Sequence, residues 1–161
     1  MLRNYQALQH IWFLKGKQRN IPADGKHQGV KFIGILNYKT GELVCVEEEP
    51  YDAEAFLCFL QHVLERYPNG KIALILDTRI HHVKLIQPFL RKHCHRLELV
   101  FLPPYIPDLN VIEGVWKWLK SDIIHNVFYS SIDEIQKNVQ DFIQELNRTP
   151  EKFHNRLYVR L

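Results

Sequence analysis

Two acidic residues stand where they could bind metal ions together. Asp77 directly follows the apolar run at residues 74–76, which is typical of a buried strand that ends in an acid. Glu113 follows a proline-rich turn over residues 103–110 and lies in the first turn of an expected helix. Carboxylates that a fold brings together from distant parts of a chain are the ligands of two-metal phosphoryl-transfer sites.

Each acid also has a purely structural interpretation. Asp77 could be a turn residue or a helix N-cap. Glu113 stands three residues after Asn110, the spacing of a capping box, where an acid also complements the helix dipole. It could equally pair with Lys117 one turn later. Taken together with the intervening turn, the two acids favour an active-site position, either working or vestigial.

The surrounding pattern predicts the elements that would hold these acids. Alternating apolar residues predict a hairpin with strands at 30–38 and 43–46, and Asp52 is an expected N-cap for the helix that follows. Further strands are expected at 9–14, 71–76 and 97–102, and further helices at 83–90, 111–123 and 131–146, the last opened by a capping box. The order predicts one α/β domain, a mixed sheet covered by helices, over residues 1–161.

Composition narrows the class of protein. With 161 residues, 46% hydrophobic and 24% charged, the chain is typical of one soluble globular domain. It has neither a long apolar run nor a segment of signal-peptide type, so we expect a cytoplasmic protein without a membrane partner. The three cysteines are expected to be reduced core thiols: Cys45, Cys58 and Cys94.

The two acidic motifs and their neighbours resemble a known family. Leu76-Asp77, then His81-His82, then Phe101-Leu102-Pro103-Pro104-Tyr105-x-Pro107-x-Leu109-Asn110-x-Ile112-Glu113-x-x-Trp116 resemble the transposases of the mariner-like superfamily. Their bacterial insertion-sequence branch, also called DDE-superfamily endonucleases, is the most similar. The resemblance runs from Trp12 to Lys120 and so covers most of the chain.

The resemblance implies a ribonuclease-H-like fold in which three acids hold two Mg²⁺ (or Mn²⁺) ions. Such enzymes cut DNA at transposon ends and join the 3′ ends to target DNA. The second acid corresponds to Asp77 and the third to Glu113, although Thr78 stands where the family usually has asparagine. The first acid belongs just ahead of Met1, and none occurs between Met1 and Pro22. We therefore expect an N-terminally incomplete domain that lacks the first strand and is impaired alone.

Basic residues suggest where DNA would lie. The loop with Lys15, Lys17 and Arg19 suits a polyanion, although charge alone favours a solvated hairpin. His82 stands where the family often has a histidine near the scissile phosphate, although a surface position is an equal alternative. On the expected helix, Lys117, Trp118 and Lys120 could lie along DNA, whereas Trp116 is expected in the core. No helix-turn-helix module that recognises transposon ends is apparent, so weak, salt-sensitive DNA binding is expected.

Two hypotheses follow. In the first, the chain is the catalytic domain of a split or truncated transposase, active when a partner polypeptide supplies the missing acid. In the second, it is a non-enzymatic remnant that folds, oligomerises and binds DNA weakly. Exposed strand edges favour a homo-oligomer in both cases. Either protein would work in the bacterial cytoplasm, at the nucleoid.

Overall fold

The computed structural model describes residues 2–3, 12, 14–17, 20–21, 29–47, 50, 52–76, 83–103, 110–151 and 156. In chain order the elements are β1 (Leu2–Arg3), β2 (Gly29–Val30), β3 (Phe32–Leu36), β4 (Leu43–Glu47), α1 (Ala53–Arg66), β5 (Ile72–Leu76), α2 (Val83–Lys92), β6 (Leu97–Phe101), α3 (Val111–Leu119), a π-helical turn η2 (Lys120–Ile124) and α4 (Ile132–Arg148). The mixed order confirms the predicted α/β class. Among the described residues, no helix is long and apolar enough to cross a bilayer.

The described strands form three pairs. β1 and β2 are antiparallel, β3 and β4 form the expected antiparallel hairpin, and β5 and β6 are parallel. The hairpin turn is held by the Asn37 side chain, which accepts hydrogen bonds from the backbone N–H groups of Lys39 and Thr40. Within the described part of the chain, no strand joins the hairpin to the parallel pair, so the expected mixed sheet is interrupted between them.

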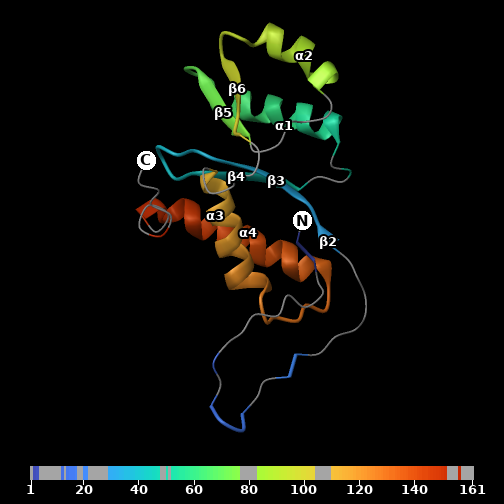
Figure 1. Cartoon of the computed structure of the whole chain (residues 1–161), viewed down its shortest axis with the longest axis vertical. Helices are drawn as coiled ribbons and strands as arrows, with labels where there is room; N and C mark the ends of the chain where they lie inside the picture. The colour runs from blue at the N-terminus through green and yellow to red at the C-terminus, as the bar shows by residue number, and fades with distance from the viewer. Residues whose placement is uncertain are drawn as a thin grey trace.

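One apolar core holds both strand pairs against the same helix. Ile33 of β3, Leu60 of α1, Leu74 of β5 and Leu97 of β6 are all buried in it. Figure 1 shows α1 and α2 on one side of the hairpin and α3 and α4 on the other. A second and a third cluster, between the hairpin and α3 and α4, complete the packing. The hairpin is therefore covered by helices on both faces.

The starts of the two longest helices follow the sequence. Asp52 caps α1, because its Oδ1 accepts a hydrogen bond of 2.9 Å from the Ala55 N–H. Ser131 caps α4 through a 3.3 Å bond from the Glu134 N–H to its Oγ. In a capping box the glutamate side chain bonds back to the backbone N–H of the N-cap residue. Here the Glu134 carboxylate instead accepts hydrogen bonds from the backbone N–H and the hydroxyl of Ser130, one residue before the N-cap.

The first residue of β4 is bonded on its outer edge by a side chain from α4. Asn147 Oδ1 accepts from the Leu43 N–H at 2.8 Å, and Asn147 Nδ2 donates to the Leu43 carbonyl at 2.9 Å. Leu43 is almost fully buried, so these backbone groups would otherwise lack partners. One side chain thus satisfies the outward backbone groups at the start of this strand edge.

Two expectations differ from the structure. The strand expected over residues 9–14 lies mostly outside the described residues, and the two that are described, Trp12 and Leu14, are highly exposed and not in a strand. The cysteines are free, but Cys58 and Cys94 are exposed, and only Cys45 is largely shielded. Cys58 lies between the inward positions Phe56 and Phe59 of α1, so helical periodicity turns it outward.

The thiols should therefore react at different rates. Burial raises the pKa of Cys45 from 9.0 to about 12, so its thiolate fraction at pH 8 falls by about a thousandfold. We expect a disulfide reagent at pH 8 to modify two thiols of the folded protein rapidly, and the third on unfolding. Cys45→Ala should remove only the thiol that reacts on unfolding. Loss of one of the two rapidly reacting thiols in that variant would contradict the identification of Cys45 as the slow one.

Candidate active site

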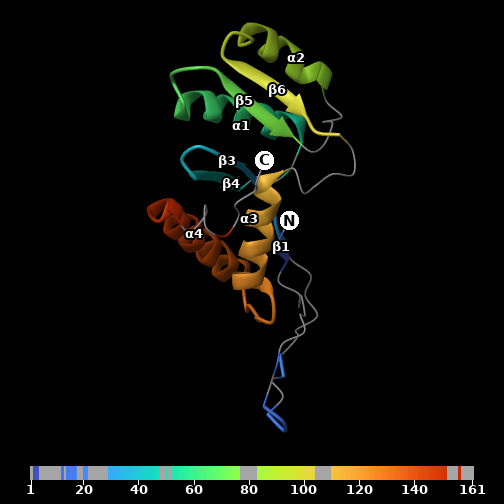
Figure 2. The ribbon, with the colours of Figure 1, turned by 60° about the vertical axis from the view of Figure 1, so that its left-hand side comes forward.

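The parallel pair brings two chain segments to one edge. β5 and β6 run in register from Ile72 opposite Leu97 to Leu76 opposite Phe101, and the Leu102 N–H donates to the Leu76 carbonyl at 2.8 Å. Figure 2 shows both strands ending toward the start of α3. Asp77 is the next residue after β5 and lies outside the described residues. Carboxyl ends of parallel strands are where α/β folds place reactive groups.

Glu113 lies in the first turn of α3. The helix begins at Val111, with Asn110 at the N-cap position. The Asn110 side chain makes no capping hydrogen bond; instead, the Glu113 N–H donates to the Asn110 backbone carbonyl at 3.0 Å. The capping-box interpretation of Asn110 and Glu113 is therefore wrong, because the Asn110 side chain does not contact the helix start as a cap must. The Glu113 side chain is half-buried.

A glycine in β3 lets α3 approach the hairpin. A Cβ atom added to Gly34 would lie 2.9 Å from Cζ2 of Trp116 and 2.7 Å from Sγ of Cys45. Trp116 packs on this bare backbone, as expected for a core residue, and Val115 and Leu119 are fully buried beside it. Glu113 lies one helical turn before Trp116. The packing of Trp116 on Gly34 therefore also fixes the position of the Glu113 backbone relative to β3. The signal was present in the sequence as a glycine within an apolar strand, which indicates close approach.

The basic residues are divided between two regions. Lys117 and Lys120 are exposed, on α3 and at the start of η2, and continue the helix from Glu113. Lys15 and Lys17 are exposed in a turn closed by the Lys17 N–H and Leu14 carbonyl. In both ribbon views the segment 14–17 lies far from the start of α3 (Figures 1 and 2). Two further candidates lie outside the described residues: Arg19 and His82.

Trp118 is occupied by contacts within the chain. Its Nε1 donates to Asp122 Oδ2 at 2.5 Å, and its ring packs edge-on against Phe142 with centroids 5.2 Å apart. The guanidinium of Arg156 covers the ring at 4.5 Å. These contacts seat α3 and η2 on α4. Trp118 therefore has a packing role that sequence reasoning did not recognise.

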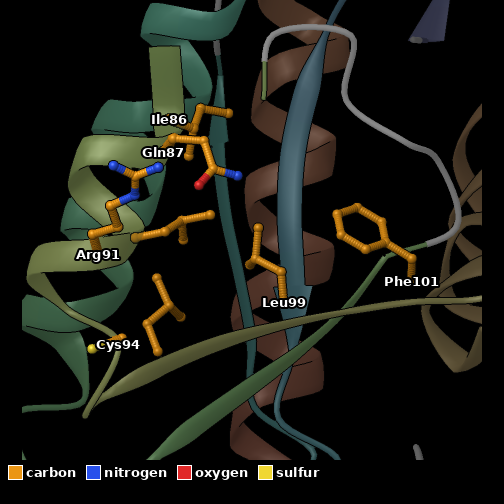
Figure 3. A pocket seen from close by; sticks show the side chains of 8 residues that line it. Ile86, Gln87, Arg91, Cys94, Leu99 and Phe101 are labelled. Carbon is orange, nitrogen blue, oxygen red and sulfur yellow. The ribbon is translucent and has the colours of Figure 1, made fainter. Parts of the chain in front are cut away.

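An apolar cavity of about 330 Å³ lies between α2 and β6. Figure 3 shows Ile86, Gln87 and Arg91 on one side of it and Leu99 and Phe101 on the other. None of its lining residues is acidic, so this cavity is unsuited to a hard cation.

The donor chemistry at the edge of the parallel pair is different. Within the described ranges no three metal-ligating side chains cluster, and Asp77 is not among those residues. Asp77, which follows β5 in the sequence, and Glu113, in the first turn of α3, offer carboxylate oxygens, the donors that Mg²⁺ and Mn²⁺ prefer. The residue types fit a divalent metal site of at least two carboxylates.

Comparisons with known proteins agree with this chemistry. The family model described as DDE superfamily endonuclease matches residues 1–136. The chain is 27% identical over 141 residues to the 39 kDa protein of insertion element IS630 from Shigella sonnei. It is 34% identical over 90 residues to protein y4pE/y4sA of Sinorhizobium fredii. These alignments cover 86% and 53% of the chain, which spans only 41% and 62% of the two relatives. No solved structure is a significant match.

Proposed function

Because the chain belongs to the DDE superfamily endonucleases, we propose that it is a transposase catalytic domain, which cuts DNA at transposon ends and transfers strands to target DNA. The observation that supports this most is the common edge of β5 and β6. Asp77 follows β5 directly, and the turn after β6 leads into α3, where Glu113 stands in the first turn. Similarity to a protein of an insertion element agrees with this role.

In this proposal Asp77 and Glu113 hold the metal ions, with Mg²⁺ or Mn²⁺ as the natural ions. Two bound ions would activate the attacking water or 3′-hydroxyl and stabilise the leaving oxygen. The protein's own task is to hold both carboxylates rigidly. Leu76 is fixed by β6, and α3 is fixed by the packing of Trp116 on Gly34.

DNA would lie across the start of α3. Lys117 and Lys120 are exposed along the line that leads from Glu113, and ammonium groups there can contact phosphate oxygens of a bound strand. Such contacts position DNA without reading its sequence. Lys15, Lys17 and Arg19 would add contacts farther along the DNA, and His82 would lie near the scissile phosphate.

The acidic set of the family has three members, and residues 1–22 contain no acid. We therefore propose that the site needs a third carboxylate besides Asp77 and Glu113, and that these residues alone are weakly active. The same shortage of acids favours a second candidate, a non-enzymatic remnant that oligomerises and binds DNA weakly.

A nicking assay separates the two candidates. Supercoiled DNA carrying the ends of the parent element is incubated with the chain, and with a chain lengthened at its amino terminus by an Asp-bearing strand. We expect the lengthened protein to nick in Mg²⁺ or Mn²⁺ and not in EDTA, and the shorter one to be at least about 100-fold slower. Failure of both proteins to nick in either metal would refute the enzymatic proposal and leave the remnant.

A further inference from the structure

β6 is bonded to β5 on one edge, and none of the described strands pairs with its other edge. Successive peptide groups of a strand point to opposite sides, so alternate residues of β6 bond to β5. The Leu102 N–H donates to the Leu76 carbonyl, so residues 98 and 100, which are in step with Leu102, face β5 as well. The backbone groups of Leu99 and Phe101 therefore point to the outer edge.

The apolar cavity between α2 and β6 lies beside this outer edge. None of its lining residues comes from β5 or α1. Leu99 and Phe101 line it with their side chains, and the same two residues turn their backbone groups outward (Figure 3). Its volume of about 330 Å³ is at the lower end of the range for ligand pockets, about 300–1,000 Å³. The cavity therefore suits a large apolar side chain from a strand that lies along β6.

The side of α2 that borders the cavity is basic. Lys84 and Arg91 are both exposed, and their spacing of two helical turns places them on one side of the helix. Residues 83–97 contain no acidic residue. The acid of β6, Glu98, points to the opposite face of the strand pair and forms an ion pair of 2.6 Å with Lys71. The positive charge beside the cavity complements a partner that carries carboxylates.

The spacing of the two cations matches an extended chain. Lys84 and Arg91 are seven residues apart, a rise of about 10.5 Å along a helix. In a strand, residues i and i+4 share a face and lie about 13 Å apart. The long side chains of lysine and arginine span the small difference. A strand with acids at i and i+4 and an apolar residue at i+2 would present both carboxylates to the cations and the apolar side chain to the cavity.

We propose that the outer edge of β6, with the cavity beside it, is a docking site for an acidic extended peptide segment of a partner protein. The segment adds to β6 as a further strand and bonds to the outward backbone groups of Leu99 and Phe101. It inserts an apolar side chain between α2 and β6 and places its carboxylates at Lys84 and Arg91.

This surface differs from the one proposed above for DNA. Figure 1 shows α2 and α3 on opposite sides of the hairpin, and peptide binding at α2 requires no catalysis. DNA would match the positive charge of α2. It has, however, neither a peptide backbone that could extend the strand pair nor an apolar side chain for the cavity. The combination of open edge, apolar cavity and cations therefore favours a peptide.

Amide hydrogen exchange with a synthetic peptide tests the docking site. The probe is acetyl-Val-Asp-Thr-Phe-Thr-Asp-Val-amide, which has its acids two residues before and after the phenylalanine. With the peptide in excess, we expect exchange at the amides of Leu99 and Phe101 to slow by about tenfold or more. The amides of Glu98 and Val100 should not change, because they already bond to β5. Unchanged exchange at Leu99 and Phe101 would overturn the docking site.

Matched peptides test how the probe binds. The isomer acetyl-Val-Thr-Asp-Phe-Asp-Thr-Val-amide has the same composition, but its acids lie on the opposite face from the phenylalanine. It should bind at least about tenfold more weakly. Two other peptides are N-methylated at one or the other set of alternate residues, and only methylation of the set that faces β6 should abolish binding. Equal binding by the isomer, or full binding by both methylated peptides, would overturn strand addition.

Charge reversal tests the role of the two cations. Lys84→Glu/Arg91→Glu should weaken binding of the probe by about tenfold or more, because like charges then face each other. A peptide with lysine in place of both aspartates should regain the lost affinity. The control Lys137→Glu/Arg148→Glu makes the same change in charge at exposed positions of α4 and should bind the probe normally. Equal weakening in the control would mean unspecific attraction and overturn the docking site.

A DNA duplex distinguishes the alternative partner. Under the proposal it should neither displace the probe from the cavity nor slow exchange at the amides of Leu99 and Phe101. Displacement of the probe together with slower exchange at both amides would assign this surface to DNA and overturn the peptide site. None of these measurements depends on nicking, so the docking site and the proposed function are tested separately.

Discussion

Replacing Glu113 by glutamine is expected to lower Mg²⁺-dependent nicking by more than about 100-fold in the protein that is lengthened by an Asp-bearing strand. Loss of even an outer-shell partner of a metal site costs about 10- to 100-fold, and Glu113 is proposed as a direct ligand. Glutamine keeps the length of the side chain and removes the charge, so α3 should fold normally. Asp77→Asn should have an effect of the same size. Nicking rates and Mn²⁺-induced broadening of the amide signals of residues 110–114 would measure the loss.

The matched control is Asp141→Asn, which removes an exposed carboxylate from α4. It should leave both the nicking rate and the Mn²⁺ broadening unchanged. Full activity of the Glu113→Gln variant, or an equal loss in Asp141→Asn, would rule out Glu113 as a metal ligand.

Gly34→Ala is expected to destabilise the protein by about 1–3 kcal/mol, the usual effect of overpacking a core. The new methyl group would lie 2.7 Å from Cys45 Sγ and 2.9 Å from Trp116 Cζ2, closer than carbon atoms approach in folded proteins. Cys45 lies in β4 directly opposite Gly34, so both its side chain and the Trp116 ring, with α3, must shift. Glu113 moves with α3, and nicking should fall along with stability. Urea unfolding and the nicking assay measure the two effects.

A double-mutant cycle shows whether this contact is responsible. Cys45→Ala removes the sulfur and should recover part of the stability in the Gly34→Ala background. Strict additivity of the two substitutions would mean that the effect of Gly34→Ala does not come from its contact with Cys45.

Local chemistry made several elements predictable. The turn at Asn37, the cap at Asp52 and the cap at Ser131 each depend on residues within four positions of one another. The two strands of the parallel pair were also predictable, because β5 is a continuous apolar run and β6 is apolar except for Glu98. The resemblance to the family was visible in a long proline-punctuated motif, and the family model matches residues 1–136. Asp77 and residues 104–109 lie outside the described residues.

Contacts between distant residues were not predictable from the sequence. The packing of Trp116 on Gly34 and the burial of Trp118 by Phe142 and Arg156 depend on how α3 crosses the hairpin and α4. The sequence marks Gly34 as unusual but does not name its partner. Periodicity identifies an amphipathic helix without saying which element its faces will meet.

The bonds from Asn147 to Leu43 also have a consequence during synthesis. They join residues 104 positions apart, so the hairpin leaves the ribosome long before Asn147 has been synthesised. At translation rates of about 5–20 residues per second, the backbone N–H and carbonyl of Leu43 lack their Asn147 partner for about 5–20 s. Neighbouring nascent chains on one messenger can pair through the outer edge of β4 in the interval. Slow translation between residues 48 and 147 should therefore lower the yield of folded protein without changing its final stability.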